Sequence, residues 1–224
     1  MKILDNGYLN LIEYWGSDQK IIEAARMSTD KGFLGWGTED KPGGEKLLKY
    51  LWKNSHSTPF EQAGLTFEVQ APIMVFREFM RHRTFSYNEF SARYSIMPNT
   101  HYLPTLERIK EVSSTNKQAQ GVNLLASDDL IEGWLYEGEA LQQAIYLHYE
   151  RGLELGIAKE VARFNTPVSR YSKMRASGNL LNWLKFDTLR NDSKAQWEIR
   201  QYAIAIGNFI KILFPRTWSV YKPQ

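Results

Sequence analysis

The sequence predicts an α/β fold of the α+β type, mainly helical, with a small antiparallel or mixed sheet. Apolar residues recur at helical spacing over long segments of the second half, from about residue 128 and again from about residue 193. Alternation of apolar and polar residues with period two is confined to short segments, and Leu65, Phe67 and Val69 give the clearest example. The 224 residues are enough to bury one sizeable core, so we expect a single domain over 1–224.

Local signals place the other elements of the first hundred residues. Ser and Asp residues before apolar runs are typical helix caps, proline is favoured at the first helical position, and glycine runs favour loops. These signals predict, in chain order, an extended segment over 1–15, a helix through Ala25 capped by Ser17 or Asp18, a loop over 32–44, a helix over 45–54, a short helix capped by Thr58 with Pro59 at its first position, and a helix from Ile73 to about Arg81.

The segment 98–127 differs from the rest because Ser, Thr, Asn, Gln and Lys are frequent and large apolar residues are few. This composition predicts a surface excursion or lid. Helical periodicity then resumes, and its tryptophans are expected in the core rather than at a ligand. The predicted elements are a long helix from Asp128 with core candidates Leu130, Trp134, Leu141, Ile145 and Tyr149, a helix over 157–164, a strand over 170–175, a helix through Leu184 capped by Ser177, and a last helix capped by Asp192 or Ser193 that ends near Pro215, with Trp183, Trp197 and Trp218 also expected in the core.

Composition excludes several kinds of chemistry. The chain has no cysteine, which rules out disulfides, cysteine–zinc sites and thiol nucleophiles. Its four histidines lack the spacing of metal ligands, so we expect no metal site. The first residues lack the apolar stretch of a signal peptide, and no run of about 18 apolar residues occurs. We therefore expect a cytoplasmic protein without a membrane span.

A cluster of cations contrasts with the modest net charge of +3: Arg81, His82 and Arg83 are consecutive, and Ser91 and Arg93 follow. A guanidinium presents a fork of N–H donors that suits phosphate and carboxylate oxygens, so the cluster predicts a phosphate-bearing ligand. A solvated helix end that complements the helix dipole is the simpler alternative. The chain lacks a Gly-x-Gly-x-x-Gly segment and a phosphate-binding loop, so a nucleotide must be held in another way.

The run from Arg81 to Tyr94 resembles the signature of the flavin-dependent thymidylate synthases, in which two arginines around a histidine are followed by seven residues and then a serine. The resemblance implies the fold of that family and the conversion of dUMP to dTMP with FAD, with 5,10-methylenetetrahydrofolate as carbon donor and NADPH as reductant. It also implies homotetramers whose active sites combine several subunits. Further blocks resemble the family in the same order along the chain: His56-Ser57-Thr58-Pro59-Phe60-Glu61, Glu160-Val161-Ala162-Arg163, and Leu189-Arg190 through Ala195-Gln196-Trp197-Glu198.

The resemblance also implies roles for individual residues. Arg190, His56 and Arg81 are the catalytic candidates. Ser91 is expected to donate a hydrogen bond to the substrate phosphate, because a serine without a neighbouring base is a poor nucleophile. The expected cofactor-binding residues are Ser28, His56, Thr58, Glu61, Arg81, His82, Arg83, Asn179 and Lys194. The expected dUMP-binding residues are Glu78, Arg81, Glu89, Phe90, Ser91, Ala92, Arg93, Arg163 and Arg190.

Some positions depart from the family pattern and leave alternatives open. Gln62 and Lys194 stand where the family often has histidine, and Leu181 stands where arginine is common. A flavin-binding homologue without synthase activity is therefore one alternative. A nucleic-acid-binding protein that uses the basic loop is another, but such proteins usually have a broader basic face, so we expect no nucleic-acid partner. Glu78 could also form an ion pair with His82 one helical turn later.

Overall fold

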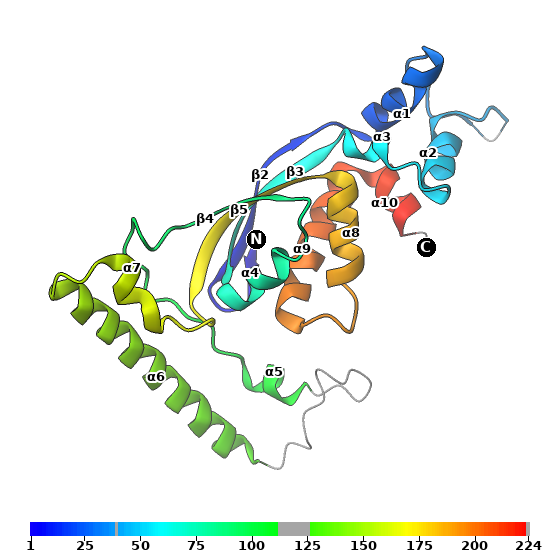
Figure 1. Cartoon of the computed structure of the whole chain (residues 1–224). Coiled ribbons are helices and arrows are strands. Elements are labelled where there is room, and N and C mark those ends of the chain that lie inside the picture. The colour runs from blue at the N-terminus through cyan, green and yellow to red at the C-terminus, as the bar shows by residue number, and fades with distance from the viewer. Residues whose placement is uncertain (39, 112–125, 223–224) are drawn as a thin grey trace.

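The computed structural model describes residues 1–38, 40–111 and 126–222, and its centre is one antiparallel sheet (Figure 1). The five strands of these residues lie in the order β1-β2-β3-β5-β4, and every neighbouring pair is antiparallel. The observed fold is mainly helical with a small sheet, which confirms the predicted fold class. The strands are β1 (Lys2–Ile3), β2 (Gly7–Trp15), β3 (Gly64–Pro72), β4 (Ser86–Glu89) and β5 (Tyr171–Asn179).

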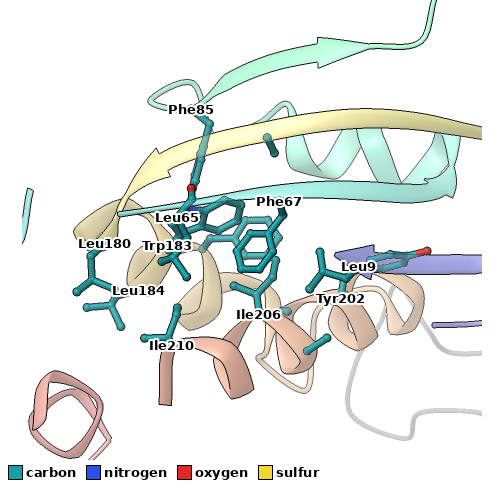
Figure 2. Close-up of a cluster of buried hydrophobic side chains, with 14 of the residues drawn as sticks. Leu9, Leu65, Phe67, Phe85, Leu180, Trp183, Leu184, Tyr202, Ile206 and Ile210 are labelled. Atoms are coloured by element: carbon teal, nitrogen blue, oxygen red, sulfur yellow. The ribbon is translucent and has the colours of Figure 1, made fainter. Parts of the chain in front are cut away.

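One face of the sheet forms the main core with two helices, α8 (Leu180–Arg190) and α9 (Trp197–Leu213), as Figure 2 shows. Leu65 and Phe67 of β3 are fully buried on this face, which confirms the predicted alternation. Trp183 lies between α8 and the sheet, and its indole Nε1–H donates to the Leu65 carbonyl oxygen at 2.9 Å. Because full burial of a large apolar side chain contributes about 1.5–3 kcal/mol, this layer is the main source of stability.

Short helices pack around one end of the sheet (Figure 1). Ser17 caps the first of them, as predicted, because its Oγ accepts from the Lys20 N–H at 3.2 Å. Thr58 does not cap the third helix: it is the first helical residue, and Ser57 precedes it. These elements are α1 (Asp18–Arg26), the 3₁₀ turn η1 (Met27–Thr29), α2 (Gly44–Lys53), α3 (Thr58–Glu61) and α10 (Pro215–Tyr221).

The long helix α6 (Asp128–Glu154) lies apart from the sheet (Figure 1), and most of its predicted core residues are exposed. Leu130, Trp134 and Leu141 are between 62% and 67% exposed, so their prediction as core residues was wrong. Periodicity shows which side of a helix is apolar, but not whether the same chain covers that side. Tyr149 is buried, as predicted, in a small second core. The buried members of this second core are Ala92, Met97, Tyr149 and Ala162.

Several predicted boundaries were also wrong. Strand β5 extends to Asn179 and contains Ser177, which was the predicted cap of the following helix. Asn179 is the actual cap of α8, because its Oδ1 accepts from a backbone N–H of the first turn at 3.0 Å. Gln196, rather than Asp192 or Ser193, precedes α9. Strand β4 and helix α10 were not predicted, because four and seven residues are too few for either periodicity to repeat clearly.

The described part of the predicted surface excursion is fastened to α9. Tyr102 is buried, and its hydroxyl donates to Glu198 Oε1 at 3.1 Å. Arg108 Nε donates to the same oxygen at 2.8 Å, so one buried carboxylate holds two points of the segment. Residues 112–125 lie outside the described residues. The remaining helices are α4 (Ile73–Phe79), α5 (Leu106–Lys110), α7 (Lys159–Ala162) and the 3₁₀ turn η3 (Arg163–Asn165).

Gly207 of α9 is a position at which we predict that only glycine fits. A Cβ atom there would lie 2.9 Å from Asp187 Oδ1 and 2.9 Å from Trp218 Cη2. Gly207→Ala should therefore lower the free energy of unfolding by about 1–3 kcal/mol through overpacking. The matched control is Gly133→Ala in α6, where no described atom lies within 4 Å of the new Cβ apart from the neighbouring backbone of the helix itself. The free energy of unfolding of this control should rise by about 0.5–1 kcal/mol, because alanine has the higher helix propensity. Equal free energies of unfolding for the two variants in urea denaturation would contradict the close packing around Gly207.

Candidate active site

The site is built around Arg190, the last residue of α8, whose side chain is 12% exposed. Its guanidinium reaches the end of α4, where Nη1 donates to Glu78 Oε2 at 2.5 Å and Nη2 donates to the Glu78 carbonyl oxygen at 3.1 Å. Its Nε donates to His82 Nε2 at 3.0 Å. Three hydrogen bonds from one planar group fix its orientation as well as its position. We call Glu78, Arg81, His82, Arg83 and Arg190 the α8 cluster.

His82 is neutral in this arrangement. Burial, followed by the positive charge of Arg190, lowers the pKa of His82 from 6.5 to about 4. Because Arg190 donates to Nε2, the neutral ring carries its proton on Nδ1. The ring packs against Phe186, with 4.8 Å between the ring centroids. The ion pair considered between Glu78 and His82 is therefore not formed, and Glu78 pairs with Arg190 instead.

Arg81 and Arg83 flank His82 in the turn after α4 and give this turn an excess of positive charge. Both are exposed, and neither has a hydrogen-bond or ion-pair partner among the described residues. The hydroxyl of Tyr87 holds the turn, because it donates to the carbonyl oxygen of Phe79 at 2.6 Å and to that of His82 at 3.2 Å. A rigid turn with unpaired guanidinium groups suits an anionic ligand.

A second set of predicted residues follows β4 and contacts α7. The Phe90 N–H donates to the β5 backbone at 2.7 Å, and the Ser91 Oγ accepts from the Arg93 N–H at 3.3 Å. Arg93 Nε also donates to Glu160 Oε2 at 2.7 Å, but both side chains are more than half exposed, so this pair contributes little to stability. We call this set, with the exposed Glu89 and the first residue of η3, the α7 group: Glu89, Phe90, Ser91, Ala92, Arg93 and Arg163.

A third set lies among the short helices at the end of the sheet. The His56 ring lies 5.6 Å from the Tyr50 ring, and Ser28 Oγ donates to the Ala25 carbonyl oxygen at 3.3 Å. Asn179 reaches this end of the sheet because α8 starts beside α3. We call this set the α3 group: Ser28, His56, Thr58, Glu61 and Asn179.

Within one chain, Glu78, His82 and Arg190 are in contact, and no hydrogen bond or ion pair among the described residues joins the α8 cluster to the α7 group. In Figure 1, α7 lies at the left of the sheet and α8 at the right. Helix α8 does connect two of the sets, because Asn179 of the α3 group caps its start and Arg190 ends it. Lys194 lies in the loop between α8 and α9, and its N–H donates to Asp192 Oδ1 at 2.8 Å.

Tyr87 and Glu160 bind residues of these sets, although neither was predicted as a site residue: Tyr87 holds the turn that contains His82, and Glu160 pairs with Arg93. Tyr87 belongs to the run from Arg81 to Tyr94, and Glu160 opens another of the matched blocks. Their positions were therefore visible in the sequence. Their partners were not, since Arg93 lies 67 residues from Glu160 in the chain.

Comparison with known proteins identifies the family. Residues 10–216 match the family model described as thymidylate synthase complementing protein. The curated flavin-dependent thymidylate synthase of Wolbachia pipientis wMel is 38% identical over 222 residues, which cover 98% of this chain and 75% of that protein. The chain belongs to the flavin-dependent thymidylate synthase family. A member from Thermus thermophilus is also 38% identical, over 98% of this chain and 77% of that protein.

Solved structures share the fold. The UMP/dUMP methylase PolB from Streptomyces cacaoi, bound with 5-Br dUMP, has a TM-score of 0.83 and 30% sequence identity. The similarity covers 99% of this chain and 96% of that chain. The structure of the same protein with 5-Br UMP gives a TM-score of 0.83 and covers 98% of this chain.

Two other features are absent from the described residues. Among the helices of residues 1–38, 40–111 and 126–222, none combines the length and the apolar character that crossing a bilayer requires. In the same part of the chain, no three His, Asp or Glu side chains are grouped so that they could bind a metal ion.

The pKa of His82 gives a testable prediction. Between pH 6.5 and about 4 the unfolded chain binds a proton at this residue and the folded chain does not, so stability should fall as the pH falls through this range. Arg190→Ala should raise the pKa of His82, because a neighbouring cation is removed. The pKa should stay below 6.5, because burial is the larger cause.

NMR titration of the His82 ring measures this pKa directly. Lys211→Ala, which removes an exposed cation of α9, is the control and should leave the His82 titration unchanged. A pKa near 6.5 in the unaltered protein, or no change in Arg190→Ala, would contradict the assigned geometry.

Proposed function

We propose that the protein converts dUMP to dTMP, with FAD as bound cofactor, 5,10-methylenetetrahydrofolate as carbon donor and NADPH as reductant. The observation that carries the proposal is the α8 cluster, in which Arg190 is held by three hydrogen bonds in a member of this family. Relatives named flavin-dependent thymidylate synthase and a structural neighbour bound to 5-Br dUMP support the same reaction and substrate.

The residues of the α8 cluster fit an anionic nucleotide cofactor. Arg81 and Arg83 supply positive charge that no described acid neutralises, and neutral His82 keeps its Nδ1–H as a donor. We assign the binding of FAD to this turn, together with the α3 group and Lys194. When bound, FAD supplies the redox chemistry of the reaction. The side chains of the protein then have to bind and orient the cofactor and the substrate and to stabilise the charge that develops in the reaction. None of these tasks needs a thiol.

Arg190 is assigned to the pyrimidine ring of dUMP. A guanidinium has five N–H donors, and three of them are used by Glu78 and His82, so two remain for a ligand. A preorganised cation at the pyrimidine carbonyl oxygens stabilises negative charge that develops on the ring during the reaction. Ser91, Arg93 and Arg163 are assigned to the phosphate. His56 is assigned to the flavin or the folate.

We propose further that each active site combines several copies of the chain in a homotetramer. Helices α7 and α8 lie at opposite sides of the sheet within one chain (Figure 1), although residues of both the α7 group and the α8 cluster are assigned to one dUMP molecule. Helix α6, which carries part of the second core, also exposes Leu130, Trp134 and Leu141. Contiguous exposed apolar side chains mark protein interfaces, so a neighbouring copy that covers α6 would account for them. A cytoplasmic location is part of the same proposal.

Two other functions have less support. A nucleic-acid-binding protein would need a broad basic face, whereas the net charge is only +3. A flavin-binding homologue without synthase activity would reflect the departures at Gln62, Leu181 and Lys194. Leu181 is only 6% exposed and belongs to the main core, so packing accounts for its apolar side chain.

The proposed function is tested by the visible spectrum of the purified protein, followed by addition of dUMP, 5,10-methylenetetrahydrofolate and NADPH. We expect a yellow protein that forms dTMP. Arg190→Ala should keep its flavin but form dTMP at least about 100-fold more slowly, because charge stabilisation is lost. Lys211→Ala is the control and should keep the parent rate.

Each rival predicts a different outcome. A colourless protein with salt-sensitive affinity for polynucleotides would favour nucleic-acid binding. A yellow protein that oxidises NADPH without forming dTMP would favour the inactive homologue. Turnover of Arg190→Ala near the parent rate would refute the role assigned to Arg190.

A further inference from the structure

Asp187 is a fully buried carboxylate in α8, one turn before Arg190. Its Oδ1 accepts from Asn191 Nδ2 at 3.0 Å. Its Oδ2 accepts from the Tyr221 hydroxyl at 2.7 Å and lies 2.7 Å from Lys222 Nζ. Both carboxylate oxygens therefore have donors, and two of the three donors come from the end of α10 or the residue that follows it.

This position is unfavourable for α8 taken alone. A negative charge near the C-terminus of a helix opposes the helix dipole, and a carboxylate loses hydration when it is buried. The helix also ends without a left-handed glycine cap, because Asn191 has φ −91° and ψ 0°. The end of α8 is instead held by the side chains of Asn191, Tyr221 and Lys222, which all contact the Asp187 carboxylate.

A second buried carboxylate fastens the opposite end of α10. Asp18 of α1 accepts from the Arg216 N–H at 2.9 Å, from the Thr217 N–H at 3.0 Å and from Thr217 Oγ1 at 2.6 Å. Asp18 therefore caps α10 from a distant part of the chain. Helix α10 is held by Asp18 at its start and by Asp187 at its end, so it joins α1 to the end of α8.

We infer that Asp187, held by Tyr221 and Lys222, is a positioning residue that keeps Arg190 aligned with Glu78 and His82. Asn191, which follows Arg190, is bound to Asp187 twice, because its backbone N–H also donates to the Asp187 carbonyl oxygen at 2.9 Å. The last turn of α8 cannot move without breaking these partly buried contacts.

The inference depends on the proposed function of Arg190, because an error of about 1 Å in a catalytic group can cost about 100-fold in rate. The three hydrogen bonds of Arg190 hold its guanidinium within a similarly small range of positions. The alignment itself is a property of the folded chain and can be measured without substrate.

The test compares Asp187→Asn and Tyr221→Phe with Asp18→Asn in the holoenzyme. All three weaken the attachment of α10, but Asp18 binds the start of α10 and has no hydrogen bond or ion pair with the α8 cluster among the described residues. One readout is the dissociation constant of dUMP, measured also in an Arg190→Lys background. The other is hydrogen exchange of the Arg190 Nε–H, observed by NMR and assigned by its loss in Arg190→Lys. Thermal denaturation and flavin content report on folding.

We expect Asp187→Asn and Tyr221→Phe to weaken dUMP binding about tenfold, and we expect the effect of Asp187→Asn to vanish in the Arg190→Lys background. Both should speed exchange of the Arg190 Nε–H, whereas Asp18→Asn should change neither readout, whatever it does to stability. Equal effects of Asp18→Asn, or an undiminished effect of Asp187→Asn in the Arg190→Lys background, would overturn the inference. If the unaltered holoenzyme does not bind dUMP, the proposed function fails, and the exchange of Arg190 alone decides the inference.

Discussion

The guanidinium of Arg190 joins the two elements on which the candidate active site depends, the end of α8 and the turn after α4. It does so through charge-assisted hydrogen bonds to Glu78 and a hydrogen bond to His82, with its side chain only 12% exposed. Partial burial makes this contact different from the exposed pair of Arg93 with Glu160, whose two partners are mostly hydrated. Breaking it would leave Glu78 without the cation that neutralises it.

The same contact explains how a cationic turn can be both rigid and free to bind a ligand. His82 is kept neutral, so only Arg81 and Arg83 carry charge in the turn, and neither has a described partner. Packing of His82 against Phe186 ties the turn to the main core. The fold therefore holds the charges in place by means of neutral and apolar neighbours, and leaves the charges themselves available.

The sequence predicted the parts of the fold that rest on local chemistry. Alternation identified β3, and the serine before α1 identified a cap, because both signals lie within a few neighbouring residues. The apolar side of α6 was found but wrongly assigned to the core, since a helix pattern does not reveal what covers it. Strand β4 was missed because its four residues are paired by the distant β5.

The candidate site was predicted to a similar extent. Motif spacing located the cationic turn and Arg190. It could not reveal that Arg190 contacts Glu78, because 112 residues separate them and only the packing of α8 against the rest of the core joins them. It also could not reveal that α7, which Arg93 contacts through Glu160, lies apart from α8 within one chain (Figure 1). That separation leads to the central claim, which is that each active site is shared between copies.

The most direct test of this claim is complementation between two inactive variants. Arg190→Ala and Arg93→Ala are co-expressed with different tags, and the mixed oligomer is isolated and assayed for dTMP formation. If one site takes Arg190 and Arg93 from different copies, a site is intact when the Arg93→Ala variant supplies Arg190 and the Arg190→Ala variant supplies Arg93. Random mixing gives this combination in about one quarter of the sites, so the activity should return to about that fraction of the parent activity. If both arginines come from the same copy, every site stays defective, and an isolated mixed oligomer without activity would contradict the account.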